Sequence, residues 1–198
     1  MKKSILIFFI PFLCFTQNFN AGIIGGISTT QVSGDGLKGF NKIGPKVGLY
    51  VNREFSWFSI QLELQYLSKG SKKLVNNTNQ NNLNTYANYK FHLDYVGVPI
   101  VCFTNITEKI KFELGTAINI LINQNEEIDF YADNSREVSR LETPILIGFI
   151  YVLNEKYSIS VRGSNSIFPI RKHSIQQSYQ WNSGQYNTGL SFNVLYEF

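Results

Sequence analysis

The stretch from Tyr186 to Phe198 alternates between apolar residues and small or polar ones. One parity carries an apolar, largely aromatic set: Leu190, Phe192, Val194, Tyr196 and Phe198. The other parity is small or polar apart from one leucine: Gly189, Ser191, Asn193, Leu195 and Glu197. Because successive side chains point to opposite faces of a β-strand, this pattern predicts a strand with one apolar face and one more polar face.

Comparable segments recur along the chain and predict eight strands. The clearest is 58–66, where Phe58, Ile60, Leu62, Leu64 and Tyr66 alternate with polar residues, and 110–122 is similar. The segment 89–103 is apolar on both parities in its second half, so the pattern does not decide which of its faces points outward. The predicted strands cover about 19–32, 43–53, 58–66, 89–103, 110–122, 143–153, 157–167 and 186–198.

The connections alternate in length. Short ones follow the second, fourth and sixth strands, and long polar ones follow the odd strands, including 72–88, 123–142 and 169–184. This alternation is typical of an eight-stranded antiparallel up-and-down transmembrane β-barrel, with short periplasmic turns and long external loops. An even strand number places both termini on the periplasmic side.

The alternation alone does not exclude a soluble eight-stranded barrel or a sandwich, in which the apolar parity would face inward. Three features favour a membrane barrel. Residues 1–17 read as a secretory signal peptide, which leaves 18–198 as one barrel domain exported to the bacterial outer membrane. The chain ends on an aromatic residue, as many outer-membrane barrels do. Aromatic residues also occur at strand ends, where an interfacial girdle would lie: Phe58, Tyr66, Phe103, Tyr157 and Phe198.

Composition narrows the functional classes. Of the 18 basic residues, Lys2 and Lys3 belong to the predicted leader, so the mature chain is nearly neutral and offers no electrostatic case for nucleic acid. Cys102 is the single cysteine of the mature chain, which excludes an internal disulfide and a cysteine-rich metal site. We expect it to be a small buried or lipid-facing residue, and we expect no cofactor.

Six charged residues lie on the polar parity of the predicted strands and should point into the barrel: Lys46, Glu63, Lys111, Glu113, Arg162 and Glu197. An eight-stranded barrel is only wide enough to be filled by side chains. Unpaired buried charges are costly, so we predict an interior plugged by ion pairs. The alternative is a narrow ion path lined by the same residues.

The external loops are the expected binding surface, because loops held by a rigid scaffold carry most binding residues. Arg171, Lys172 and Trp181 form a basic-aromatic group that could contact lipopolysaccharide phosphates or a partner, or simply lipid headgroups. An enzymatic interpretation would rest on His92 and Asp94, but their sequence context defines no nucleophile. We therefore expect no catalytic residues.

Several stretches resemble the PorT-like outer-membrane β-barrel family of the Bacteroidetes. The most specific are Gln-x-Glu-Leu-x-Tyr at 61–66, followed by Lys69-Gly70, and Tyr-x-x-x-Pro at 95–99. Others lie at 21–28, 47–51, 112–115, 147–149 and 192–198. Gly97 stands where family members often carry an acidic residue.

The resemblance implies an outer-membrane barrel and, through the founding member, a link to protein secretion of the type IX kind. Combined with the residue patterns, it predicts a non-enzymatic binding or scaffold component of the cell envelope. Its expected partners are outer-membrane lipid and envelope or secretion-system proteins. The alternative is a small pore or transporter for ions or small solutes.

Overall fold

The computed structural model describes residues 19–35, 37, 39–73, 88–132, 136–172 and 184–198. The predicted signal peptide lies outside this part of the chain. Among the described residues, no helix is long and apolar enough to cross a membrane. The strands are β1 (Phe19–Ser33), β2 (Lys42–Glu54), β3 (Ser59–Lys72), β4 (Tyr89–Asn105), β5 (Ile110–Ile128), β6 (Tyr131–Ala132), β7 (Leu141–Glu142), β8 (Pro144–Val152), β9 (Tyr157–Ser166) and β10 (Tyr186–Glu197).

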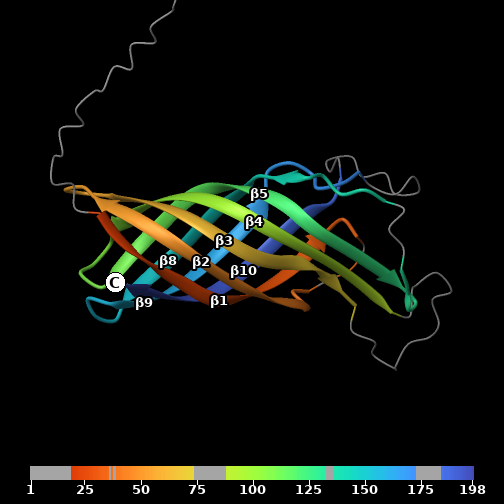
Figure 1. Cartoon of the computed structure of the whole chain (residues 1–198), viewed down its shortest axis with the longest axis horizontal. Coiled ribbons are helices and arrows are strands. Elements are labelled where there is room, and N and C mark those ends of the chain that lie inside the picture. The colour runs from red at the N-terminus through yellow and green to blue at the C-terminus, as the bar shows by residue number, and fades with distance from the viewer. Residues whose placement is uncertain (1–18, 36, 38, 74–87, 133–135, 173–183) are drawn as a thin grey trace, which may run out of the picture.

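Eight of these strands form a closed antiparallel barrel, which confirms the predicted fold (Figure 1). The order β4-β3-β2-β1-β10-β9-β8-β5 is closed by the pairing of β4 with β5, and the short strands β6 and β7 attach to β5. Closure matters in a bilayer because hydrocarbon offers no partner for an unpaired backbone group. The strands lean across the barrel axis, and the C-terminus lies at the end that carries the short turns.

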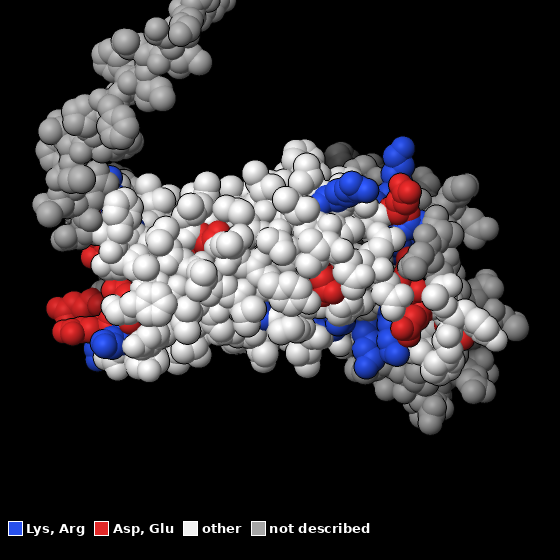
Figure 2. Space-filling model, viewed as in Figure 1, with Lys and Arg blue, Asp and Glu red and all other residues white. Residues whose placement is uncertain are grey.

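The outer wall is apolar and the inner wall is polar, the reverse of a soluble barrel. On β3, Leu62 and Leu64 are about half exposed, whereas their neighbours Gln61 and Glu63 are buried. The same alternation holds on β2, β5, β8 and β10. Figure 2 shows a wall largely free of charged side chains in its middle, with charges gathered at the two ends. This apolar band is the surface that a membrane barrel presents to lipid.

Two strand-level expectations need correction. Phe103 was expected in an outer aromatic girdle, but it points inward and packs with Val101 and Ile150. The odd parity of β4 therefore faces the lumen, and Cys102 faces outward. Residues 123–128, expected in a loop, extend β5, because their backbone pairs with residues 89–94 of β4.

The ladder between β4 and β5 shifts register between Asp94 and Tyr95, where Asp94 pairs with Asn123 and Tyr95 pairs with Leu121. Ile122 is therefore an extra residue on β5, as in a β-bulge. Beyond it, Glu126 points inward and Glu127 outward, so the parity of β5 is reversed. β4 and β5 project beyond the neighbouring strands at the end opposite the C-terminus (Figure 1).

Arginine substitutions at two apolar, exposed positions should separate a lipid-facing site from a solvent-facing one. Leu64 lies in the middle of the apolar band, and Trp57 lies in the turn between β2 and β3. We expect Leu64→Arg to lower the free energy of unfolding in phospholipid vesicles by about 2–4 kcal/mol, and Trp57→Arg by about 1 kcal/mol or less. Urea titrations in vesicles measure both values. Equal costs at the two positions would contradict a lipid-facing wall.

Candidate functional site

The central charge cluster joins three strands across the barrel interior. Arg162 of β9 donates from Nη1 and Nη2 to the two carboxylate oxygens of Glu63 on β3, each at 2.8 Å. Arg162 also donates to Glu113 on β5, through Nε and through Nη2, the latter at 3.1 Å. All three residues are almost fully buried. The planar guanidinium suits this arrangement because its fork of donors matches two carboxylates.

Lys46 of β2 balances the charge of this central cluster. Its side chain is buried, and Nζ lies 3.5 Å from the Ser191 hydroxyl oxygen on β10. Gln61 donates to Glu63 at 2.8 Å. With Lys46 and Arg162 set against Glu63 and Glu113, the formal charges cancel, as burial requires.

A second cluster lies closer to the long-loop end. The Lys69 ammonium on β3 contacts both carboxylate oxygens of Glu142 on β7, at 2.8 and 2.9 Å. Asn119 and Ser166 donate to the same carboxylate at 2.9 and 2.6 Å. A cavity of about 20 Å³, with room for about one water molecule, lies between this cluster and the central one. The interior is thus filled by side chains at this level.

Arg171 closes the long-loop end of the interior. It donates to Glu126 of β5 from Nη1 at 2.6 Å and from Nη2 at 2.9 Å, and to the Tyr89 hydroxyl at 3.1 Å. Its guanidinium lies 4.2 Å from the centre of the Phe91 ring and also donates to Gln185. Arg171 was expected in a possible binding group of the external loops; the structure instead buries its side chain, because the segment after β9 folds inward.

The chain between β5 and β8 also folds into the barrel mouth. Val138 and Ile170 pack in an apolar cluster with Phe91, Leu93 and Tyr95. A backbone hydrogen bond joins the two inward segments, because Ser139 N–H donates to the Ile170 carbonyl at 2.7 Å. A second one ties the first segment to β5, where Leu121 N–H donates to the Arg140 carbonyl at 2.9 Å. An apolar plug therefore lies between the Lys69–Glu142 and Arg171–Glu126 pairs.

The six predicted interior charges divide into two groups. Lys46, Glu63, Glu113 and Arg162 meet in the central cluster. Lys111 and Glu197 lie at the short-turn mouth, where they line a hollow of about 50 Å³, and Lys111 Nζ lies 3.5 Å from Glu54. Of the predicted loop residues, Lys172 is exposed, and Trp181 lies outside the described residues.

Sequence analysis missed the interior charges Lys69, Glu126 and Glu142. Lys69 continues the inward parity of Glu63 and Gln65 on β3, which was a usable signal. Glu126 and Glu142 lie in a stretch without regular alternation, so no periodicity marked them as inward. Gly97 faces Asn119, and a β-carbon there would come within 2.1 Å of the Asn119 amide oxygen.

Two ionisable groups outside the membrane-spanning strands have shifted pKa values. Burial would lower the pKa of Arg171, but hydrogen bonds and the charge of Glu126 raise it overall, so its cation is retained. Burial raises the pKa of Asp35 despite opposing hydrogen bonds from Ser71 and the Leu37 N–H. Both groups help to hold the long-loop end in place.

His92 and Asp94 do contact one another, with Nε2 of the ring 3.0 Å from the carboxylate. Tyr66 and Asn123 also donate to Asp94, at 2.9 and 3.0 Å. These side chains lie on the outer wall, opposite in parity to Phe91 and Leu93. Among the described residues, no hydroxyl or thiol is hydrogen-bonded to His92 itself. No group of three or more potential metal ligands occurs in the same part of the chain.

Comparison with known proteins shows the fold. The chain matches no family model and no curated protein sequence. It is similar to the crystal structure of Neisserial surface protein A, NspA, at 10% identity and a TM-score of 0.59, covering 92% of this chain and 100% of that one. It is also similar to Ail, the attachment invasion locus protein of Yersinia pestis, in complex with the heparin analogue sucrose octasulfate. That match has 14% identity and a TM-score of 0.51, and covers 91% of this chain and 99% of that one.

Removing one partner of the Lys69–Glu142 pair should cost more than removing both. Lys69→Met leaves a buried carboxylate without its cation, and we expect it to lower the free energy of unfolding by about 3–5 kcal/mol. The double variant Lys69→Met/Glu142→Gln should recover most of that loss, since the remaining amide can still bond Asn119 and Ser166. Urea unfolding in vesicles measures both. A double variant as unstable as Lys69→Met would show that the pair is not the source of the cost.

Proposed function

We propose that this chain is a non-enzymatic outer-membrane barrel that serves as a binding or scaffold component of the cell envelope. The carrying observation is the filled interior: three charge clusters and an apolar plug occupy successive levels of the barrel. Because the interior offers no room for a solute, the working surface is the outside of the molecule. The apolar band and the similarity to NspA and Ail support the membrane placement.

The end with the long connections is the proposed binding surface. Its described residues include exposed or half-exposed charges on the segments that close the mouth, namely Arg136, Glu137, Arg140 and Lys172. Arg136 donates to the Lys172 carbonyl at 2.8 Å, which fixes these segments relative to one another. Ail, a barrel of the same fold, was crystallised in complex with the heparin analogue sucrose octasulfate, which supports a role of this kind of barrel in contacting polar surface molecules.

The nature of the partner is a further proposal. The resemblance to the PorT-like family suggests an envelope or type IX secretion-system protein as the partner, and this stays a prediction from the sequence. Lipid turnover by the pure protein, abolished by His92→Ala, would replace the binding role with an enzymatic one. Conduction through the barrel would require the side chains of the Arg162 cluster, and those of the apolar plug, to move apart and open a path.

Conductance tests the pore alternative directly. We expect the purified barrel to give no stepwise currents in planar bilayers, because the ion pairs of Arg162 and Lys69 close the path at two levels. A general porin reconstituted in the same bilayers serves as the positive control. Reproducible steps of one amplitude would overturn the sealed-interior basis of this proposal.

Crosslinking in intact cells tests the binding role. We expect a tagged chain to recover an envelope protein at a fixed ratio, and the double charge reversal Arg136→Glu/Lys172→Glu to reduce that recovery. The matched control is Lys109→Glu/Lys156→Glu, which changes the same charge at the short turns of the opposite end. Recovery of the barrel alone, or an equal loss with both variants, would contradict binding at the long-connection end.

A further inference from the structure

The outer wall changes character beyond the β-bulge. Below it, the outward positions of β4 and β5 are apolar, as at Ile100, Ile118 and Ile120. Above it, the outward positions carry Lys90, His92, Asp94, Asn123, Asn125 and Glu127. This polar wall therefore begins where the apolar band ends, which in a membrane barrel is the level of the lipid headgroups.

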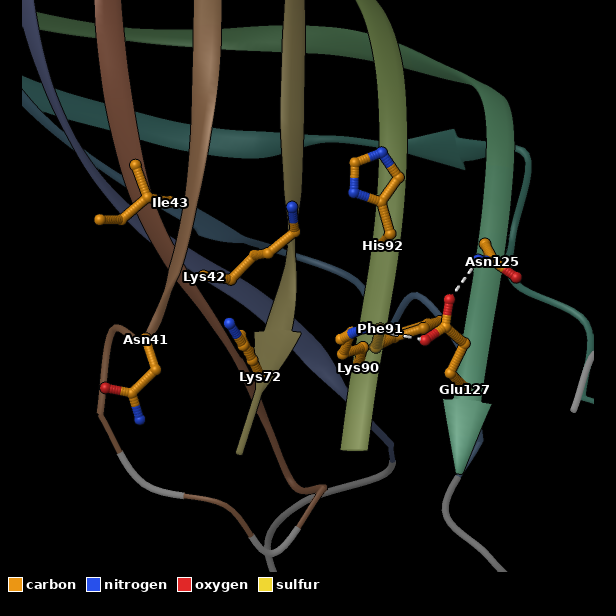
Figure 3. A pocket seen from close by; sticks show the side chains of 9 residues that line it. All are labelled: Asn41, Lys42, Ile43, Lys72, Lys90, Phe91, His92, Asn125 and Glu127. Atoms are coloured by element: carbon orange, nitrogen blue, oxygen red, sulfur yellow. Dashed lines mark hydrogen bonds and ion pairs between the residues drawn. The ribbon is translucent and has the colours of Figure 1, made fainter. Parts of the chain in front are cut away.

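A hollow of about 420 Å³ opens in this polar wall. The ladder between β2 and β3 ends at the pair Lys46–Leu67, so the first residues of β2 and the last residues of β3 are not paired with each other at this level. The lining of the hollow includes Lys42 of β2, Lys72 of β3, and Lys90 and His92 of β4 (Figure 3). Ile43, the neighbour of Lys42, is 64% exposed and belongs to the apolar band.

The acidic groups around the hollow already have partners. Glu127 accepts from Lys90 at 3.2 Å and from Asn125 at 3.2 Å. Asp94 accepts from Tyr66, Asn123 and His92. Both carboxylates therefore already accept hydrogen bonds from neighbouring side chains. Figure 3 shows the two contacts of Glu127, to Lys90 and to Asn125.

Lys42 and Lys72 are the cations that remain. The Lys42 ammonium is attracted by Asp94 and repelled by Lys72, but no acidic residue among those described forms an ion pair with either lysine. Lys42 is partly withdrawn from solvent. Two neighbouring like charges at a half-buried position repel one another, and an anion between them would relieve this repulsion.

We propose that this hollow binds the phosphate of an outer-leaflet lipid headgroup, with Lys42 and Lys72 as its ligands. A lipid fits because the exposed Ile43 lines the same hollow as both cations, so one molecule can place its phosphate between the ammonium groups and its acyl chains along Ile43 and the wall below. Lys90 and Asn125 line the outer side of the hollow and are available to contact the polar part of the headgroup. The assignment rests on the outer-membrane placement proposed above.

Lipid retention by the purified full chain tests the site. The barrel is reconstituted in phosphatidylcholine nanodiscs containing either monophosphoryl lipid A or the same lipid without its phosphate, and bound lipid is counted by native mass spectrometry after release into neutral detergent. We expect selective retention of the phosphorylated lipid, and about tenfold weaker retention by Lys42→Gln/Lys72→Gln. Lys42→Arg/Lys72→Arg should retain it as the wild type does.

The control variant Lys109→Gln/Lys156→Gln removes two charges at the short turns and should not change retention. Equal retention of the two lipids, or an unchanged value in Lys42→Gln/Lys72→Gln, would overturn the lipid site while leaving the membrane barrel intact. Complete displacement by excess inorganic phosphate would show a site for free anions and overturn the lipid assignment. Failure of the wild-type chain to insert into nanodiscs would overturn the membrane placement and the lipid site with it.

Discussion

Every backbone N–H and C=O in hydrocarbon must find a partner within the protein, and the rest of this structure follows from that requirement. It is met by closing the sheet through β4 and β5. A closed sheet has one face toward lipid and one toward a narrow interior, so the sequence must alternate with period two. The outward parity supplies the apolar band, and the inward parity brings polar side chains into a space that cannot hydrate them. Arg162, Lys69 and Arg171 each meet a carboxylate for that reason.

The same reasoning explains what could be predicted from the sequence. Eight strands and their approximate bounds could be predicted because lipid outside the barrel and the narrow interior select opposite residue types at alternate positions. Lys46, Glu63, Glu113 and Arg162 were readable as inward because they lie in regular strands. Phe103 was not, since β4 is apolar on both parities there and only packing against Val101 and Ile150 decides its direction.

The remaining parts of the site escaped prediction for two physical reasons. Glu142, Ile170 and Arg171 lie in segments whose inward folding depends on contacts with distant residues, which no local pattern encodes. The bulge at Ile122 reverses the parity of β5, so an extrapolated alternation would place Glu126 on the wrong face. The hollow beside Lys42 and Lys72 arises where a ladder stops, a feature of strand pairing rather than of either strand alone.

The central cluster also bears on the order in which the barrel can assemble. Glu63 and Glu113 belong to the first half of the chain, whereas the guanidinium that binds both belongs to β9, near the other end. An N-terminal half inserted alone would carry Glu63 and Glu113 into the membrane with only Lys46 to balance them, which leaves one carboxylate uncompensated at a cost of several kcal/mol. We therefore expect stable insertion of β1 to β5 to depend on β9. A barrel whose interior charges pair across the length of the sequence gains its full stability in the bilayer only when both halves are present.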